Sequence, residues 1–171
     1  MLWQGFYKKV INVSYPKFLL LIDNSGSMYG EKIASLNLAV NNLFKGLANV
    51  DDKIEVAVIT FGDSVNFFKF IPVSEIENVC YEARGSTKLS EAVALVSKLA
   101  NKNTITVLIS DGAFNDGEFT KTTLKGFTFA IAIGYDTDYE ALASFTGDKS
   151  KILQAFDAYD AAGYMLFKVY N

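Results

Sequence analysis

The sequence contains no histidine and only one cysteine, Cys80, among its 171 residues. The absence of histidine excludes the serine, cysteine and zinc hydrolase sites that use imidazole as a base or as a metal ligand. A single cysteine excludes an internal disulfide, and a lone cysteine is more often a small buried hydrophobic residue than a nucleophile. Any chemistry must therefore depend on carboxylates, hydroxyls, lysines or a hard metal ion.

Two further absences concern charge and long apolar runs. The formal net charge is -3 and no run of Lys or Arg exceeds two residues, so we expect neither nucleic acid nor a membrane as a partner. The longest apolar stretches, such as Phe18–Ile22, are far too short to cross a bilayer. No apolar segment of signal-peptide length follows the two lysines near the N-terminus, so we expect a cytoplasmic protein in a reducing compartment.

The overall composition is that of a globular protein. Half of the residues are apolar, 14% are aromatic and 20% are charged, which is enough apolar side chain to build a core. We find no linker, internal repeat or low-complexity stretch. The sequence therefore predicts a single domain over residues 1–171, and it leaves the oligomeric state open.

Apolar runs rich in Val, Ile and Phe predict four buried strands at Phe18–Ile22, Ile54–Phe61, Thr104–Ser110 and Phe127–Ile133. None alternates between apolar and polar residues, which favours a parallel sheet covered on both faces. The segment VNFFKF, residues 65–70, follows a turn and is typical of an antiparallel hairpin partner at the sheet edge, with its aromatic rings packed in the core and along that edge.

Helical patterns separate these strands. Apolar residues at spacings of three and four predict helices over residues 31–50 and 88–100, with shorter helices over 139–145 and 158–170, and residues 151–156 read as a last short strand. The alternation predicts an α/β fold with an open, doubly wound, mostly parallel sheet and one antiparallel edge strand.

Acids and hydroxyls follow several of the predicted strands and turns. In open α/β sheets ligands bind at the carboxyl ends of the strands, so these segments are expected to converge. Oxygen atoms of Asp, Ser and Thr without His or Cys are the ligands that Mg²⁺ or Mn²⁺ prefers. The alternate spacing in DNSGS lets Asp23, Ser25 and Ser27 face one point, and Gly26 allows the chain to turn tightly there.

Each of these groups also has a simpler explanation. Ser25 or Ser27 could cap the following helix, Asp23 could be a turn residue, and the SDG at 110–112 is a common turn sequence. Their joint placement at strand ends favours the metal site, although one serine could both bind the metal and cap the helix.

Four other residues near these segments are left with two interpretations. Asp116 could support a metal ligand through a hydrogen bond or form an ordinary Asx turn. Tyr29, Phe114 and Phe119 could form an aromatic rim around a binding surface or be tucked into the fold. Asp63, in contrast, is assigned to the turn of the hairpin.

Three segments together resemble the von Willebrand factor A (vWA) domain. They are DNSGS at 23–27, GSTKL at 85–89 and SDG at 110–112, and the metal-ion-dependent adhesion site (MIDAS) of that family uses three such segments in this order. The resemblance covers nearly the whole chain and is greatest to small stand-alone bacterial and phage members, including the tellurium-resistance type. Ser86 departs from the pattern, because the family commonly has a second glycine there.

The resemblance implies a Rossmann-like vWA fold and a metal-dependent protein-interaction module rather than an enzyme. It assigns Ser25 and Ser27 as direct ligands of Mg²⁺ or Mn²⁺, and Thr87 as a direct or water-mediated ligand. Asp23 and Asp111 would act mainly through coordinated water. One coordination position stays open, and in the family a Glu or Asp carboxylate of a partner protein fills it.

Two other functions match the sequence less well. A Mg²⁺-dependent phosphatase-like hydrolase on a Rossmann-like fold also begins with Asp after the first strand, but it needs a second acid two positions later, where this chain has Ser25. A phosphate-binding loop requires four residues between its glycines followed by Lys; here three residues separate Gly26 from Gly30, and Glu31 precedes Lys32. The interaction module remains the favoured function, with the hydrolase as the alternative.

Overall fold

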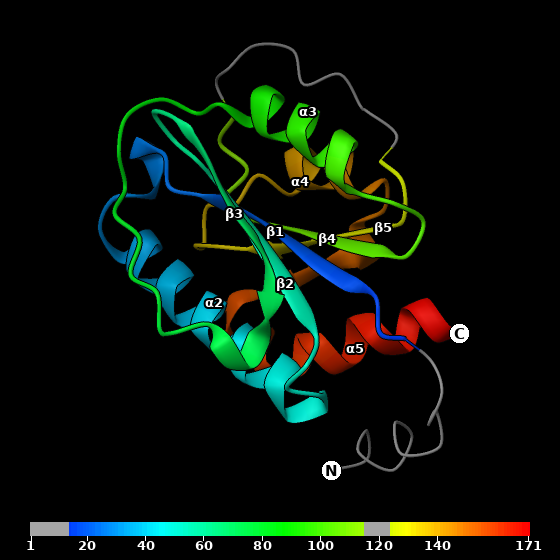
Figure 1. The fold of residues 1–171 in the computed structure, drawn as a ribbon. Coiled ribbons are helices and arrows are strands. Elements are labelled where there is room, and N and C mark those ends of the chain that lie inside the picture. The colour runs from blue at the N-terminus through cyan, green and yellow to red at the C-terminus, as the bar shows by residue number, and fades with distance from the viewer. Residues whose placement is uncertain (1–13, 115–123) are drawn as a thin grey trace.

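A central sheet lies between two layers of helices in the computed structural model, which describes residues 14–114 and 124–171 (Figure 1). The strand order is β3-β2-β1-β4-β5-β6. The strands are β1 (Lys17–Asp23), β2 (Glu55–Phe61), β3 (Val65–Pro72), β4 (Thr104–Ser110), β5 (Phe127–Ala132) and β6 (Ile152–Gln154). The helices are α2 (Glu31–Val50), α3 (Leu89–Leu99), α4 (Tyr139–Thr146) and α5 (Ala158–Tyr170).

The central strand β1 pairs in parallel with β2 on one side and β4 on the other, so that Leu20 lies opposite both Val58 and Val107. The pairs β4–β5 and β5–β6 are also parallel. Strand β3 runs antiparallel to β2, with a register shift between Val56 and Val58. The predicted fold class, including the antiparallel edge strand, is confirmed.

The apolar strands are continuous because both faces of the sheet are covered. On β1, Phe18, Leu20 and Ile22 pack in a core with residues of α2 and α5. Leu19 and Leu21 point to the opposite face, into a second core with α3 and α4. Full burial of one such side chain contributes about 1.5–3 kcal/mol to stability, so both faces of β1 favour its central position in the sheet.

Glycines and an aspartate set the ends and contacts of the helices. Gly30 precedes α2 with a φ of 83°, and Gly147 ends α4 with a φ of 77°. The side chain of Asp138 caps α4 by accepting a 3.0 Å hydrogen bond from the amide of Ala141. Gly46 lets α2 approach α5, since a Cβ at that position would lie only 2.1 Å from the carbonyl oxygen of Tyr159.

Two details of the predicted strands differ in the structure. The last strand is limited to the three residues of β6, because the short 3₁₀ turns Lys149–Lys151 and Ala155–Asp157 occupy either side of it. On β3, Phe70 packs against the second core, but Phe67 and Phe68 are 42% and 57% exposed. The prediction that the β3 rings pack was therefore wrong for these two, because an edge strand has no neighbour on its outer side.

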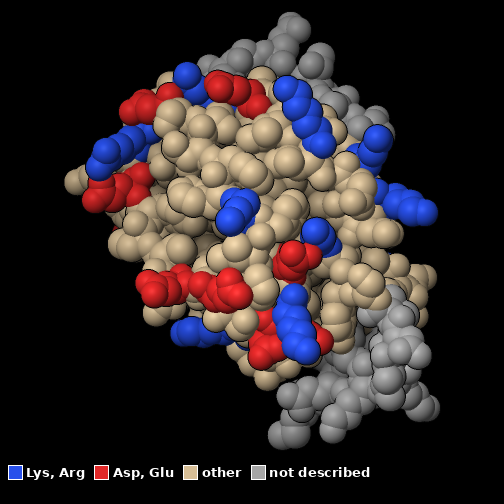
Figure 2. Space-filling model, viewed as in Figure 1, with Lys and Arg blue, Asp and Glu red and all other residues tan. Residues whose placement is uncertain are grey.

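Charged side chains of both signs are interspersed over the face seen in Figure 2. That face carries no continuous basic patch. Among the helices of the described residues, none combines the length and the apolarity needed to cross a bilayer.

Candidate metal centre

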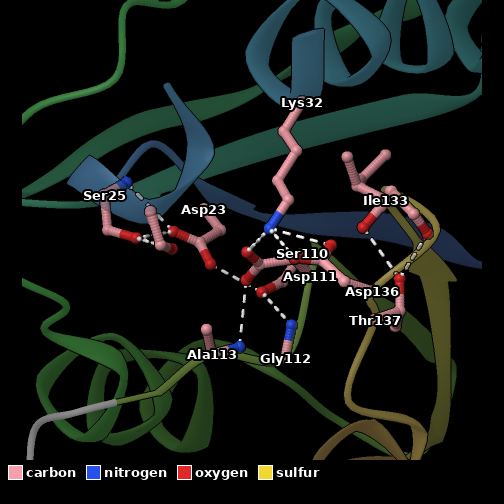
Figure 3. A network of polar contacts seen from close by, with 12 residues as sticks. Asp23, Ser25, Lys32, Ser110, Asp111, Gly112, Ala113, Ile133, Asp136 and Thr137 are labelled. Atoms are coloured by element: carbon pink, nitrogen blue, oxygen red, sulfur yellow. Dashed lines mark hydrogen bonds and ion pairs between the residues drawn. The ribbon is translucent and has the colours of Figure 1, made fainter. Parts of the chain in front are cut away.

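The predicted site lies at the carboxyl ends of β1 and β4 (Figure 3). The chain runs outward from β1 in one direction through β2 and β3, and in the other through β4, β5 and β6. The order of the strands therefore reverses between β1 and β4, and the loops that follow these two strands diverge there. Such a junction is where α/β sheets bind ligands.

Asp23, the last residue of β1, is fully buried and accepts three hydrogen bonds. Its Oδ1 accepts from the backbone N–H of Ser25 at 3.0 Å and from the Ser25 hydroxyl at 2.6 Å. Its Oδ2 accepts from the hydroxyl of Ser110 at 2.5 Å, and that hydroxyl in turn accepts from the amide of Gly112 at 3.0 Å. Asp23 thus joins its own loop to the end of β4.

Burial also changes the protonation of Asp23. Desolvation raises the pKa of this carboxyl, and the negative charge of Asp111 adds to that effect, while the hydrogen bonds from Ser110 and Ser25 oppose it. The net pKa is raised. A nearby cation would favour the ionised form, so Asp23 is placed where positive charge is stabilising.

The two serines of the first loop lie together. Their Oγ atoms are 3.3 Å apart, with Ser25 buried and Ser27 exposed. The side chain of Ser25 makes no capping hydrogen bond to the short 3₁₀ turn Gly26–Met28, and α2 begins after Gly30 without a side-chain cap. Helix capping therefore does not explain why these hydroxyls lie beside Asp23.

The loop that carries Thr87 is fastened to the first loop by backbone contacts. The amide of Gly26 donates to the carbonyl of Gly85 at 2.8 Å, and the amide of Arg84 donates to the carbonyl of Asn24 at 2.8 Å. A Cβ on Gly26 would lie 2.9 Å from the Gly85 oxygen, so this approach requires glycine. Thr87, two residues further on, is 2% exposed.

Asp63 does more than complete the hairpin turn to which the sequence assigned it. Its Oδ1 accepts from the amide of Ser86 at 3.1 Å and so links the β2–β3 turn to the Thr87 loop. Gly85 has a φ of 61°, and a Cβ there would fall 1.3 Å from the same oxygen. The adjacent Ser86, where the family commonly has glycine, is compatible with this arrangement because it contributes its backbone amide.

Asp111 follows β4 and is almost completely buried. Its Oδ1 accepts from the amide of Ala113 at 2.9 Å, and its Oδ2 accepts from the ammonium of Lys32 at 2.8 Å. The same ammonium lies 3.0 Å from the carboxylate of Asp136. Partial burial alone would lower the pKa of Lys32, but the hydrogen bonds to Asp111 and Asp136 outweigh that effect and raise it.

The sequence did not predict Lys32 or Asp136 as contributors, or the hydrogen bond from the hydroxyl of Ser110 to Asp23. Asp136 lies in the turn after β5, so applying the rule about carboxyl ends to that strand as well would have found it. Lys32 offers only a weak signal, a cation in the first turn of a helix, where the helix dipole disfavours positive charge.

The donor set fits a hard divalent cation. In the part of the chain that the structure describes, no three His, Cys, Asp or Glu side chains lie together so that they could hold a metal ion by themselves. A metal at this edge would therefore need hydroxyl oxygens as well as carboxylates, and the hydroxyls of Ser25 and Ser27 lie beside Asp23. These donors are all oxygen atoms, which suit Mg²⁺ or Mn²⁺.

The aromatic residues predicted to surround the site differ in their exposure to solvent. Tyr29 is 83% exposed, whereas Phe114 is partly buried against the second core. Asp116 and Phe119 lie outside the described residues. Tyr29 is therefore the one member of the predicted rim that the described structure places on the surface.

Comparison with known proteins gives a family and a fold. The model of the von Willebrand factor type A domain matches residues 18–113. A search of curated proteins finds no match.

Three solved structures illustrate the fold. An ArnB paralog, VWA2, from Sulfolobus acidocaldarius is 18% identical with a TM-score of 0.66, over 88% of this chain and 45% of the other. The manganese-loaded TRAP protein from Plasmodium vivax has the same identity and TM-score, and the match covers 88% of this chain and 72% of the TRAP chain. Proximal thread matrix protein 1 from the mussel byssus, with a zinc-occupied MIDAS motif, is 15% identical with a TM-score of 0.62, over 89% and 47%.

At these identities the likeness concerns the fold alone, and this chain spans less than half of the Sulfolobus and mussel proteins. The match to the family model, in contrast, covers more than half of this chain and includes the segments 23–27, 85–89 and 110–112. The chain belongs to the von Willebrand factor type A domain family.

Proposed function

We propose that this protein is a metal-dependent interaction module that binds Mg²⁺ or Mn²⁺ and uses the ion to hold a carboxylate of a partner protein. The observation that carries the proposal is the position of the fully buried Asp23. It accepts hydrogen bonds from Ser25 and from Ser110, and so joins the loops after β1 and β4 at the edge where a ligand binds. A buried acid among hydroxyls, at the reversal of strand order, is a favourable place for a hard cation.

Each residue has a distinct task in this proposal. The hydroxyls of Ser25 and Ser27 are the direct ligands, and Thr87 is a ligand that contacts the ion directly or through water. Asp23 and Asp111 supply negative charge, mainly through water molecules on the ion. Two acids balance a dication, so the carboxylate of an incoming Glu or Asp is not repelled by surplus negative charge.

Related proteins support a metal at this place. The TRAP structure is manganese-loaded, and the mussel protein has a zinc-occupied MIDAS motif. Type A domains are typically interaction modules rather than enzymes. The hydrolase alternative gains nothing from the structure, because the position that would need a general acid holds Ser25, whose hydroxyl donates to Asp23.

The identity of the ion, the cellular location and the subfamily belong to the same proposal. The choice of Mg²⁺ or Mn²⁺ over other ions follows from the oxygen ligands. A cytoplasmic location and a kinship with the tellurium-resistance type remain predictions from the sequence.

Thermal unfolding with Mn²⁺ tests the metal site. Ser27 is the sharpest variant, because it is exposed and its hydroxyl contacts that of Ser25, so Ser27→Ala removes a proposed ligand with little effect on folding. An ion at 100 times its Kd stabilises by about 2.7 kcal/mol, which raises the Tm of a domain of this size by roughly 5–10 °C. We expect that rise in the parent and its loss in Ser27→Ala.

The matched control is Ser74→Ala, an exposed serine in the turn after β3, which should keep the full rise. An equal rise in Ser27→Ala would place the ion elsewhere and contradict the assigned ligands. The partner carboxylate is tested on arrays of peptides with Glu or Asp and matched Gln or Asn versions. Binding that needs Mn²⁺, needs the carboxylate and is lost in Asp23→Ala supports the proposal, and binding indifferent to Gln or Asn contradicts it.

A further inference from the structure

The geometry points to Lys32 as an internal cation that competes with the metal ion for Asp111, with Asp136 as the alternative acceptor that receives the ammonium when the ion binds. This inference rests on the proposed function, because it concerns the affinity of the same metal site. It assigns Lys32 and Asp136, which are not metal ligands, the role of setting how tightly the ion is held.

The contact between Lys32 and Asp111 is close and sheltered from water. The Nζ atom lies 2.8 Å from Oδ2 of Asp111, and the side chains are 22% and 1% exposed. The other oxygen of Asp111 accepts from the amide of Ala113. Both carboxylate oxygens therefore already have a donor, and the negative charge that Asp111 would offer to a dication is shared with an ammonium.

Asp136 contacts the same ammonium at the same time as Asp111 does. Its carboxylate lies 3.0 Å from Nζ of Lys32, and its side chain is 52% exposed. The two acids come from different loops, after β4 and after β5, and Figure 3 shows the Lys32 side chain extending from α2 to both. Small rotations at the end of a lysine stem are enough to shift the ammonium toward one acid or the other.

A glycine beside the aliphatic part of the Lys32 side chain leaves space for it. Gly134, with a φ of 87°, lies beside it, and a Cβ on this glycine would be 3.2 Å from Cε of Lys32 and 3.1 Å from Oδ1 of Asp136. The lysine sits in the first turn of α2, where the helix dipole disfavours a positive charge. Its two acidic partners are therefore what makes this position favourable.

Charge balance gives the consequence for the metal. Asp23 and Asp111 alone would neutralise a dication, but the ammonium of Lys32, shared between Asp111 and Asp136, reduces the negative charge that Asp111 offers to the ion. When the ion binds, it repels the ammonium and draws on the same carboxylate. Binding is then favoured when the ammonium moves to Asp136, and it is weaker than it would be without the lysine.

The test is calorimetric titration of the whole protein with Mn²⁺ at low ionic strength, on the parent, Lys32→Met, Asp136→Asn and the double variant. Methionine keeps an apolar stem and removes the charge. We expect Lys32→Met to bind Mn²⁺ at least about tenfold more tightly, because a unit positive charge next to the ion is gone. Asp136→Asn should bind more weakly than the parent, since the ammonium then has only Asp111.

The double variant separates the two explanations for Asp136. If Asp136 acts through Lys32, its substitution changes the affinity by less than about twofold in the Lys32→Met background. An equal loss in both backgrounds would show that Asp136 attracts the ion directly, and that would overturn the inference. The matched control is Lys45→Met, which removes the same charge from an exposed lysine about 20 Å further along α2 and should change affinity by less than about twofold.

Failure of the inference and failure of the proposed function give different results. Binding by the parent with no gain in Lys32→Met overturns the inference and leaves the metal site in place. No binding by any of the variants at millimolar Mn²⁺, with all of them folded by circular dichroism, overturns both.

Discussion

Ser110 at the end of β4 donates a 2.5 Å hydrogen bond to Asp23 at the end of β1, across 87 residues of sequence. Both groups are fully buried, and the Ser110 hydroxyl also accepts from the amide of Gly112. This one hydroxyl therefore fixes the position of Asp23 at the end of β1 and the path of the chain that follows β4.

Replacing Ser110 by alanine should destabilise the protein. The change leaves an oxygen of Asp23 and the amide of Gly112 without their partner, and an unsatisfied buried polar group costs about 1–3 kcal/mol. Urea unfolding in EDTA measures this loss. The control is Ser97→Ala on α3, an exposed serine whose hydroxyl donates to the carbonyl of Val93 in its own helix; it should stay within about 0.5 kcal/mol of the parent. Equal losses in the two variants would contradict the role given to Ser110.

Asp23→Asn should be more stable than the parent in EDTA at pH 7. Burial raises the pKa of Asp23 in the folded state, so the neutral carboxyl is favoured there. The stability from this group is fully present below the unfolded pKa and is lost as the pH rises through the folded pKa. A neutral amide avoids that loss.

Urea unfolding of both proteins between pH 4 and pH 7 measures the effect, and the advantage of Asp23→Asn should grow with pH. In Mn²⁺ the order should reverse, because the parent alone gains from the ion. A variant less stable than the parent at every pH in EDTA would show that the hydrogen bonds to Asp23 outweigh its burial.

Gly85→Ala should weaken Mn²⁺ binding much more than Gly30→Ala. Both glycines have positive φ, so both substitutions strain the backbone by about 1–3 kcal/mol. A Cβ at Gly85 would also fall on the carboxylate of Asp63, whereas a Cβ at Gly30 meets nothing within 4 Å. Displacing Asp63 frees the loop that carries Thr87.

Calorimetric titration with Mn²⁺ gives the affinity of each glycine variant, and urea unfolding gives its stability. We expect backbone strain to lower the stability of both variants, and we expect the affinity for Mn²⁺ to fall in Gly85→Ala alone. Similar affinities in the two variants would mean that the link from Asp63 to Ser86 does not position the metal site.

Ionisation of the Tyr81 phenol should destabilise the protein in strong alkali. Burial raises the pKa of Tyr81 to about 12, above its ordinary value of 10.0. The neutral phenol is favoured in the folded state, so its stabilisation is complete below pH 10 and is lost as the pH rises toward 12. Relative to Tyr81→Phe, the parent should lose up to roughly 2 kcal/mol over that range.

Urea unfolding of the parent and Tyr81→Phe at intervals from pH 9 to pH 12 measures the difference. The pKa values of Tyr15 and Tyr170 are also raised by burial, but both proteins contain these residues and their effect cancels in the comparison. Parallel curves for the two proteins would contradict the assignment.

The fold was predictable because its signals are local. Continuous apolar runs predicted strands covered on both faces, and β1 has this arrangement, with Leu20 and Leu21 in opposite cores. The edge position of VNFFKF followed from its hairpin turn. The exposure of Phe67 and Phe68 did not, because an apolar residue on an edge strand leaves the same pattern whether or not another element covers it.

The site was predictable only in part, for a similar reason. Asp23, Ser25 and Ser27 lie within five residues, and their spacing reveals a shared loop. Lys32 meets acids that are 79 and 104 residues away, through a long side chain whose direction no local pattern fixes.

The order of the strands also determines when the site forms during synthesis. Domains generally fold as units during synthesis, and DNSGS leaves the ribosome long before the SDG segment that ends β4 and lies beside it in the sheet. Until β4 pairs with β1, Asp23 has neither Ser110 nor Asp111 nearby. A nascent or truncated chain would therefore not capture a metal ion, and ion binding would report that synthesis has passed residue 111.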